Sequence, residues 1–438
     1  FEISEDFDTP VFLRTATRVA HSQSLVSLSD RVEKELVPYE KNVQKYVMTP
    51  GNAIKRHPVV EERMEKLRDF AETSGINRVE MGDTSLGFIT AGVCYQYLKE
   101  CLPKASVLKL GMVNPLPMKL IADFASKVDK LIIIEELDPV IETQVRAAGI
   151  KVSGGKDLFG LCGELSQNKI RKALGLSVAE STGFGENLPA RPPTLCPGCP
   201  HRGLFYTLSK LGLTVMGDIG CYTLGAAPPL SSVDTTVCMG ASIPNLHGFT
   251  TVCGEEMAKN TVAVIGDSTF IHSGITGLID VVYNKGQSTV LILDNSITGM
   301  TGHQDNPTTG KTIKGTPAPQ VSIEKLCEAV GVNRVFVCDP YDLKGLSDLV
   351  VRELKMQEPS VIIARRPCVL IPEVRAKLAP ALSIDHEKCV GCKKCMGIGC
   401  PAISFSDKKA TIDETLCVGC ELCMKMCAFE AIGKKEGK

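Results

Sequence analysis

The sequence lacks several features that would place a protein of 438 residues in a broad class. No unbroken apolar run approaches the roughly twenty residues that span a bilayer, and 49 Lys and Arg against 50 Asp and Glu leave a formal net charge of −1. The first absence predicts a soluble, cytoplasmic protein that does not bind membranes. The second predicts no basic surface for nucleic acid. Tryptophan is absent, which excludes nothing.

Cysteine, in contrast, is abundant, with nineteen copies. Eight of them form two runs near the C-terminus, Cys-x2-Cys-x2-Cys-x4-Cys-Pro and Cys-x2-Cys-x2-Cys-x3-Cys. The two runs belong to an internal repeat, because residues 384–396 and 412–424 agree at eight of thirteen positions. Thiolates at this spacing typically bind [4Fe–4S] cubes, and in two-cluster ferredoxins the fourth cysteine of each run binds the other cube.

This crossover divides the eight thiols into two ligand sets. The first ferredoxin group is Cys389, Cys392, Cys395 and Cys427. The second ferredoxin group is Cys417, Cys420, Cys423 and Cys400. Zinc is the main alternative for paired Cys-x2-Cys, whereas disulfides are disfavoured because nineteen is odd and no signal peptide is visible. The longer gap before Cys400 indicates a local insertion.

Upstream of these runs, apolar strands alternate with helical segments, a pattern typical of parallel sheets covered by helices. We therefore predict an α/β protein with two doubly wound parallel-sheet domains, followed by a small α+β ferredoxin domain. The predicted boundaries are 1–45 (a domain tail and linker), 46–180 (first α/β domain), 181–195 (a Gly- and Pro-rich linker), 196–372 (second α/β domain), 373–383 (linker) and 384–438 (ferredoxin domain).

The N-terminal region supports two more detailed expectations. Residues 8–14 have the pattern of a buried strand whose sheet is missing, which suggests that the chain is a fragment without an upstream domain. Residues 31–45 are polar and charged and are predicted to form a linker helix.

Two consecutive strands of the second α/β domain end in polar residues. The strand 261–265 leads into Gly266-Asp267-Ser268, and the strand 289–293 leads into Asp294-Asn295. Ligands of open parallel sheets bind beyond the carboxyl ends of the strands, so Asp267 and Asn295 should lie side by side. A carboxylate and an amide oxygen suit Mg²⁺, and Gly266 would let the backbone approach a diphosphate. Gly-Asp-Ser alone is equally consistent with an ordinary turn from strand to helix.

Together these residues resemble the diphosphate-binding domain of thiamine diphosphate enzymes, in which Gly-Asp-Gly/Ser is followed, about twenty-five residues later, by Asn-Asn. The resemblance implies a Mg²⁺ ion held by Asp267, Asn295 and the carbonyl of Ile297, with Asp294 in place of the first asparagine. The cofactor contacts that it implies are Met239, Gly240, Ala241, Gly266, Asp267, Ser268, Asn295 and Ile297.

Four more cysteines fall in predicted loops of the same domain, in Cys196-Pro-Gly-Cys199-Pro-His201, Gly217-Asp-Ile-Gly-Cys221 and Arg365-Arg-Pro-Cys368. They resemble the proximal [4Fe–4S] site of 2-oxoacid:ferredoxin oxidoreductases, which implies that this proximal group (Cys196, Cys199, Cys221 and Cys368) binds a third cube. A zinc knuckle or simply buried thiols is the alternative.

The remaining seven cysteines are expected to be buried structural thiols. They are Cys94, Cys101, Cys162, Cys238, Cys253, Cys327 and Cys338. Of these, Cys238, Cys253 and Cys338 compete with Cys368 as fourth ligand of the proximal group. Three histidines near the predicted site, His201, His272 and His303, could move protons. We take His201 and His272 as candidate catalytic residues.

The order of these motifs, with Leu-Asp-Asn-Ser-Ile-Thr-Gly-Met-Thr-Gly-His-Gln at 293–304 and the double ferredoxin, resembles the large subunit of the indolepyruvate:ferredoxin oxidoreductase family. The resemblance implies that residues 46–180 form a transketolase C-terminal-like domain and that the chain starts in the tail of a pyrimidine-binding domain. The missing part of that domain would supply the glutamate that activates the cofactor.

The activity implied is oxidative decarboxylation of an arylpyruvate with coenzyme A. The implied cofactors are thiamine diphosphate, Mg²⁺ and three [4Fe–4S] clusters, and the implied partners are a smaller beta subunit, in a hetero-oligomer, and external ferredoxin. Three alternatives stay open: another 2-oxoacid as substrate, a non-redox thiamine decarboxylase with an appended ferredoxin, or an electron-transfer subunit without catalysis.

Overall fold

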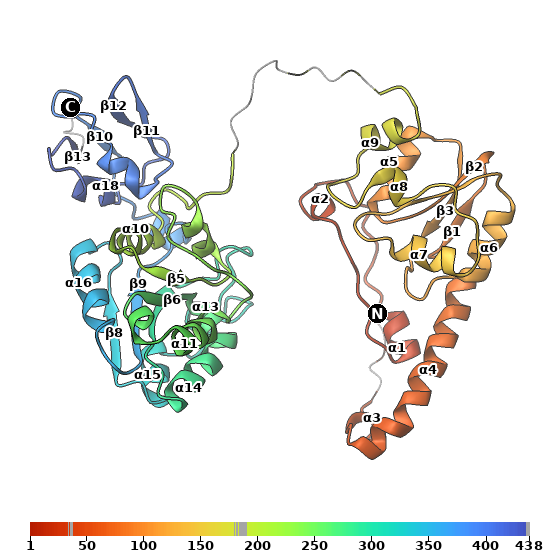
Figure 1. Ribbon diagram of the computed structural model, residues 1–438, viewed down its shortest axis with the longest axis horizontal. Helices are drawn as coiled ribbons and strands as arrows, with labels where there is room; N and C mark the ends of the chain where they lie inside the picture. Colours follow the sequence, from red (N-terminus) through yellow and green to blue (C-terminus); the bar gives the residue numbers. More distant parts are fainter. Residues whose placement is uncertain (34, 36–37, 179, 181–182, 184–190, 435–438) are drawn as a thin grey trace. The chain divides into compact units, whose positions relative to one another are not determined.

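The computed structural model of the chain describes all residues except 34, 36–37, 179, 181–182, 184–190 and 435–438 (Figure 1). It forms two compact units, Phe1–Asn187 and Leu188–Lys438. Each is built on its own sheet, so the units are described separately. Most of the predicted linker 181–195 lies outside the described residues.

The first unit contains a four-stranded sheet in the order β1-β3-β2-β4. Strands β2, β3 and β4 are parallel, and β1 pairs antiparallel to β3. The strands are β1 (Arg78–Glu80), β2 (Asp83–Ala91), β3 (Ala105–Leu110) and β4 (Leu131–Ile134). The helices are α1 (Glu2–Phe7), α2 (Thr17–Ala20), α3 (Val43–Tyr46), α4 (Pro50–Thr73), α5 (Val93–Cys101), α6 (Met118–Ser126), α7 (Val140–Ala147), α8 (Lys156–Phe159) and α9 (Gln167–Ala173).

The described residues of the N-terminal region form neither the predicted strand at 8–14 nor a continuous helix over 31–45. Residues 8–14 form no strand, and Phe12 and Leu13 are each 92% exposed. Among the described residues of 31–45, only the start of the short helix α3 is helical. The long helix is instead α4, which has Pro50 in its first turn, where the missing N–H has no cost. Only Leu67 and Ala71 of α4 are buried, so its sequence carries little apolar periodicity.

The second unit is built on five parallel strands in the order β5-β6-β7-β9-β8. They are β5 (Thr214–Met216), β6 (Thr261–Gly266), β7 (Thr289–Asp294), β8 (Arg334–Cys338) and β9 (Ser360–Arg365). The helices are α10 (His201–Leu211), α11 (Ser242–Cys253), α12 (Glu255–Ala258), α13 (Asp267–Thr269), α14 (Ile275–Tyr283), α15 (Ile323–Ala329), α16 (Leu343–Glu353) and α17 (Pro372–Arg375), with short helical turns η1 (Cys221–Ala226) and η2 (Phe270–Gly274).

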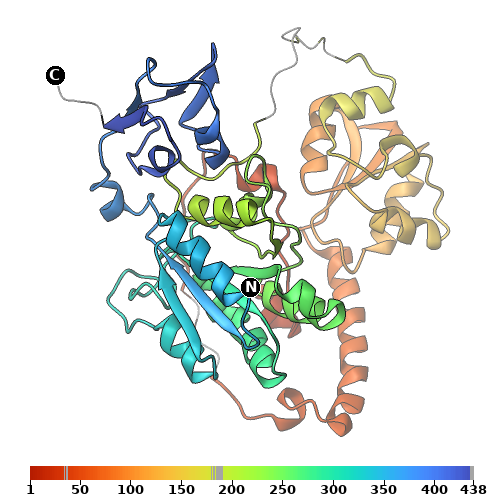
Figure 2. The ribbon, with the colours of Figure 1, turned by 60° about the vertical axis from the view of Figure 1, so that its left-hand side comes forward.

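Helices cover both faces of this sheet, as Figures 1 and 2 show. Successive strand residues point to opposite faces, so Val262 and Val264 of β6 pack toward α10 and α16, whereas Ala263 and Ile265 pack toward α11 and α14. Strand β6 is buried along its whole length. The arrangement confirms the predicted α/β fold with parallel sheets.

The C-terminal segment forms two antiparallel strand pairs in the same unit. It contains β10 (Leu382–Ile384), η3 (Lys394–Ile398), β11 (Ile403–Ser406), β12 (Lys409–Ile412), α18 (Leu422–Lys425) and β13 (Ile432–Lys434), with β10 paired to β13 and β11 to β12. Its apolar core includes Tyr341 from the sheet domain. Figure 2 shows this blue segment beside α10.

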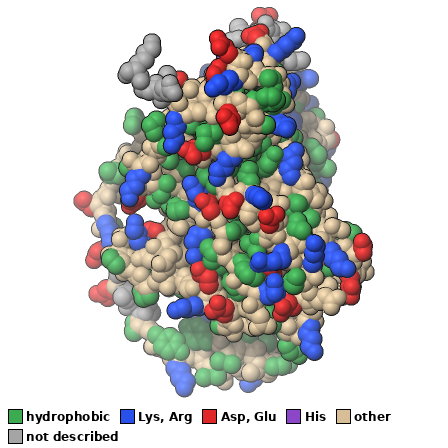
Figure 3. Space-filling view, turned by 90° about the vertical axis from the view of Figure 1, so that its left-hand side faces the viewer, with side chains coloured by type: hydrophobic (Ala, Val, Ile, Leu, Met, Phe, Trp, Pro, Cys, Tyr) green, Lys and Arg blue, Asp and Glu red, His purple; other side chains and the backbone are tan. Residues whose placement is uncertain are grey.

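The surface of the described residues adds two observations. On the face shown in Figure 3, side chains of Lys and Arg are interspersed with those of Asp and Glu. In the part of the chain that the structure describes, no helix combines the length and the apolar character needed to cross a membrane.

Candidate functional site

The candidate site lies at the carboxyl ends of strands β6 and β7. Asp267 follows β6 directly and Asn295 follows β7, and the register pairs Gly266 with Leu293. Asp267 is 3% and Asn295 7% exposed. A Cβ on Gly266 would lie 2.5 Å from the Tyr222 ring, so only glycine fits at this turn. The structure therefore brings the two predicted Mg²⁺ ligands to the same buried edge of the sheet.

Among the described residues, no cation forms an ion pair with Asp267. Burial raises the pKa of its carboxyl group to about 7, and the nearby charge of Asp294 adds to the effect. The backbone N–H of Ser268 donates to Asp267 Oδ1 at 2.7 Å, and the hydroxyl of Thr308 lies 3.5 Å from Oδ2. These contacts offset only part of the burial. A divalent cation would stabilise the charged carboxylate, so the donor set fits Mg²⁺.

Asp294, which stands in place of the asparagine of the motif, has its own cation. Arg365 Nε donates to Asp294 Oδ2 at 2.6 Å, and the Arg365 Nη1 atom donates to Glu324 Oε1 at 2.6 Å. The extra negative charge at position 294 is thereby partly balanced within the protein, by a cation that Asp294 shares with Glu324. This pairing gives a physical reason why an aspartate is compatible with the site.

The glycine turn at Met239–Ala241 is held by Asp218, a fully buried residue after β5. Both carboxylate oxygens of Asp218 accept from Gly240 N, at 3.0 and 2.9 Å, and Oδ2 also accepts from Ser242 N at 3.2 Å. Gly240 has a φ of +89°, and a Cβ there would lie 2.4 Å from Ser273 Oγ. The buried hydroxyl of Ser242, in the first turn of α11, has no hydrogen-bond partner. A free donor at a helix N-terminus fits a diphosphate group.

The proximal group comes together from three loops. Cys196 and Cys199 precede α10, Cys221 begins η1 and Cys368 follows β9. The pKa of the Cys199 thiol is raised to about 12, mainly by burial, and the neighbouring thiols of Cys196 and Cys368 contribute to the rise. Cys221 is likewise in electrostatic contact with Cys368 and Cys196. The structure thus groups the four predicted cysteines.

The rival cysteines are placed differently. Cys238 and Cys253 are exposed. Cys338 lies at the end of β8, and the charges that act on it belong to Asp339 and Asp342. Cys368 is therefore the cysteine that the structure places with the other three.

His201 and Asn295 connect the proximal group to the Mg²⁺ pair. The backbone N–H of Cys368 donates to the carbonyl of Asn295 at 2.9 Å. Asn295 Nδ2 also lies 3.4 Å from Nε2 of His201, which is only two residues beyond Cys199. Burial lowers the pKa of His201 to about 4, so its ring is neutral near pH 7. His272 and His303 are exposed.

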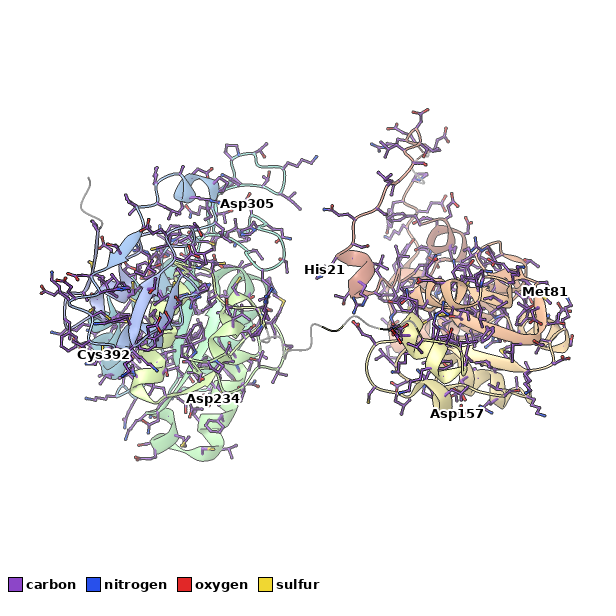
Figure 4. All side chains as sticks on the ribbon, turned by 90° about the horizontal axis from the view of Figure 1, so that it is seen from above. His21, Met81, Asp157, Asp234, Asp305 and Cys392 are labelled. Atoms are coloured by element: carbon purple, nitrogen blue, oxygen red, sulfur yellow. The ribbon has the colours of Figure 1, made fainter. Side chains whose placement is uncertain are left out.

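The structure also brings together cysteines of each ferredoxin group, whose assignment to clusters stays a prediction. Cys389, Cys392, Cys395 and Cys427 line one small pocket. In the second group, Cys423 is in electrostatic contact with Cys420, Cys400 and Cys417. Cys392, labelled in Figure 4, is exposed. No set of three or more His, Cys, Asp or Glu side chains suited to a metal ion is found within the described residues.

Comparison with known proteins identifies the family. Residues 218–364 match the C-terminal TPP binding domain of thiamine pyrophosphate enzymes. The chain is 38% identical to the indolepyruvate oxidoreductase subunit IorA of Archaeoglobus fulgidus over 99% of this chain and 73% of the relative. It is 36% identical to the subunit IorA of Pyrococcus horikoshii, over 100% of this chain and 75% of the relative. The chain belongs to the IorA family of indolepyruvate oxidoreductase subunits.

A more distant relative matches only part of the chain. The 2-oxoacid:ferredoxin oxidoreductase subunit beta of Saccharolobus solfataricus is 26% identical over 207 residues, which are 42% of this chain and 64% of the relative. Membership of the IorA family confirms the oxidoreductase class and the resemblance seen in the motifs. The matched domain confirms thiamine diphosphate as the cofactor.

Some residues of this IorA family member depart from the sequence predictions. Three of the seven cysteines that were expected to be buried, Cys162, Cys238 and Cys253, are exposed, so that prediction is wrong for them. Cys94, Cys101 and Cys327 are buried, and Cys338 is half-buried.

Other residues of the site carry no signal in the sequence. Thr308 reaches Asp267 from a loop without regular structure, forty-one residues further along the chain. Tyr222, which covers Gly266, and Arg202, which crosses to the C-terminal segment, belong to no recognised motif. Only Asp218 could have been noticed, because it lies in Gly217-Asp-Ile-Gly-Cys221, directly after a predicted strand.

Proposed function

We propose that the chain catalyses ferredoxin-dependent oxidative decarboxylation of an arylpyruvate such as indolepyruvate. The 2-oxoacid loses CO₂ and its acyl group forms a thioester with coenzyme A. Two electrons pass singly to two molecules of oxidised ferredoxin, and one proton is released. The proposed partners are external ferredoxin and a smaller beta subunit, and the proposed location is the cytoplasm.

The observation that carries this proposal is the connection between the Mg²⁺ pair and the proximal cysteines. Asn295 contacts Cys368 through its carbonyl oxygen and His201 through its amide. Electrons released at a cofactor held by Asp267 and Asn295 would therefore appear beside thiols suited to an iron–sulfur cluster. A decarboxylase without a redox step has no need for this proximity.

Different residues of the site would bind different parts of the cofactor. Asp267, Asn295 and the carbonyl of Ile297 would bind Mg²⁺, while Ser242 and the N-terminus of α11 would meet the diphosphate. Neutral His201 fixes the orientation of the Asn295 amide without adding charge. Bound thiamine diphosphate supplies an electron sink at the carbon from which CO₂ leaves.

The three cysteine groups would bind the clusters that carry the electrons. We assign one [4Fe–4S] cluster each to the proximal group and to the two ferredoxin groups, and such clusters accept electrons one at a time. The proximal group lies next to the Mg²⁺ pair, and Cys392 of the first ferredoxin group is exposed. We assign residues 46–180 to a transketolase C-terminal-like domain, 196–372 to the thiamine-binding domain and 384–438 to the ferredoxin domain.

The first test is the content of iron and acid-labile sulfide in protein purified without oxygen together with its natural partner subunits. Three cubes require about twelve irons per chain, and two require about eight. The variant Cys368→Ser should lower the count toward eight, whereas the matched variant Cys338→Ser should leave it at about twelve. Eight irons in the unchanged protein would contradict the proximal cluster and favour a non-redox thiamine enzyme.

The second arm of the test concerns the substrate. The reduction of ferredoxin should require coenzyme A and should be faster with indolepyruvate or phenylpyruvate than with pyruvate, compared as kcat/KM. Equal or higher kcat/KM for pyruvate would contradict the arylpyruvate assignment while leaving the oxidoreductase assignment intact.

A further inference from the structure

Arg202 is a cation buried where the thiamine-binding domain meets the C-terminal ferredoxin segment. It is the second residue of α10 and is 2% exposed. Its Nε atom donates to the carbonyl of Cys196 at 3.0 Å, and Nη2 donates to the carbonyl of Leu195. Its Nη1 atom donates to the carbonyls of Ile398 and Gly399, at 3.1 and 2.6 Å. One guanidinium thus binds both segments, which lie side by side in Figures 1 and 2.

The acceptors around Arg202 are main-chain carbonyls, which carry no formal charge. A buried cation is costly unless an anion balances it. The strongest charges that act on the guanidinium come from cysteines of two different groups, Cys400 and Cys420 on one side and Cys199 and Cys196 on the other. These residues become anionic when they bind iron, because the ligand of an iron–sulfur cluster is the thiolate.

Two further hydrogen bonds hold together the segments that surround Arg202. The hydroxyl of Tyr341 donates to the carbonyl of Gly198 at 2.5 Å, and Lys425 Nζ donates to the carbonyl of Tyr341 at 2.8 Å. A Cβ on Gly198 would lie 2.2 Å from Val418, so the proximal loop and the ferredoxin segment touch without space between them. Arg202 therefore has little freedom to move away from either group.

We propose that Arg202 is a positioning residue that serves as the shared counter-ion of two clusters, the proximal one and that of the second ferredoxin group. This rests on the proposed function, which assigns those clusters. Each cluster gains one negative charge when it accepts an electron, and a fixed cation in a medium of low dielectric constant favours that reduced state. Arg202 thereby raises the reduction potentials of both clusters and affects that of the first ferredoxin group less, because no cysteine of that group is among the main charges that act on the guanidinium.

The test is a redox titration of the holoenzyme followed by electron paramagnetic resonance, after iron analysis of every variant. In Arg202→Gln, which removes the charge, two of the three midpoint potentials should become more negative. We expect at least a tenfold change in the reduction equilibrium, or about 59 mV for one electron. Arg202→Lys, which keeps the charge, should stay within about twofold of the unchanged protein by the same conversion.

Lys210→Gln is the matched control, because Lys210 lies on the same helix but is exposed, where solvent screens its charge. It should shift no potential. If Arg202→Gln fails to assemble its clusters, Arg202→Lys tests the proposal instead. A large shift of its midpoint potentials at full iron content would overturn the charge mechanism. Unchanged potentials in an Arg202→Gln protein with about twelve irons would overturn this proposal alone. Only eight irons in the unchanged protein would overturn the proposed function as well.

Discussion

Both units place carboxylates directly after the strands of a parallel sheet, but the carboxylates have different partners. In the first unit Glu135 follows β4, and its two oxygens accept the backbone N–H groups of Ile141 and Glu142, each at 2.9 Å. Glu135 therefore caps the N-terminus of α7. In the second unit Asp267 follows β6. Burial outweighs the hydrogen bonds to its carboxylate and raises its pKa to about 7.

The difference shows that a carboxylate at a strand end is not by itself a sign of function. Glu135 is satisfied by the protein, so it stabilises the fold. In Asp267 burial outweighs the hydrogen bonds to the carboxylate, and the proposed Mg²⁺ would stabilise its charged form. Asp218, in the second unit, resembles Glu135, because it accepts backbone N–H groups at the start of α11. The supply of hydrogen-bond donors separates structural carboxylates from a metal ligand.

The largest effect should come from removing each carboxylate in turn. Asp267→Asn should weaken Mg²⁺-dependent binding of thiamine diphosphate by more than about 100-fold, because losing a ligand should exceed the 10- to 100-fold effect of losing a residue behind a ligand. Glu135→Gln should leave the affinity unchanged but lower the free energy of unfolding by about 1.5–3 kcal/mol. Calorimetric titration and urea denaturation measure the two quantities. Equal losses of affinity in both variants would refute the contrast.

A smaller effect should come from the turn that Asp218 supports. Gly240→Ala should weaken binding of thiamine diphosphate by about tenfold, because the added Cβ would lie 2.4 Å from Ser273 Oγ at a backbone φ of +89° and strain of this kind costs roughly 1–3 kcal/mol. Gly248→Ala is the control, since nothing lies within 4 Å of a Cβ at that position in α11. The control should keep its affinity and gain about 0.5–1 kcal/mol of stability. Unchanged affinity in Gly240→Ala would show that the turn does not contact the cofactor.

A further effect should be a dependence of stability on pH. The pKa of Asp267 is raised from 3.8 to about 7 in the folded protein, so between these values the folded state holds a proton that the unfolded state has lost. The free energy of unfolding of the cofactor-free protein should therefore fall as pH rises from 4 toward 7, by at most about 1.4 kcal/mol per pH unit. Denaturation at several pH values should show this slope, and Asp267→Asn should lack it. The same slope in both proteins would assign it to other groups.

The sequence predicts those parts of the site that depend on spacing along the chain. The ferredoxin cysteines are close in sequence, and Gly266-Asp267 and Asn295 follow strands that are recognisable as apolar runs. The strands β6 and β7 were predicted for the same reason. In each case the information is local, so a single sequence suffices.

The parts that could not be predicted depend on contacts between distant segments. Thr308 approaches Asp267 through an irregular loop, and Arg202 binds carbonyls nearly two hundred residues away, which have no sequence signature. Helix α4 was missed because few of its side chains are buried. The apolar pattern of residues 8–14 predicted a buried strand, yet Phe12 and Leu13 are exposed, because a short apolar run does not supply a strand to pair with.

The hydrogen bonds described between the thiamine-binding domain and the ferredoxin segment join side chains to the main chain. Arg202 binds the carbonyls of Ile398 and Gly399, the Tyr341 hydroxyl binds that of Gly198, and Lys425 binds that of Tyr341. A carbonyl is present whichever amino acid occupies the accepting position. Accepting positions can therefore change during evolution without a compensating substitution across the contact. Pairwise covariation between the two segments should accordingly be weak, while selection acts mainly on the donor side chains.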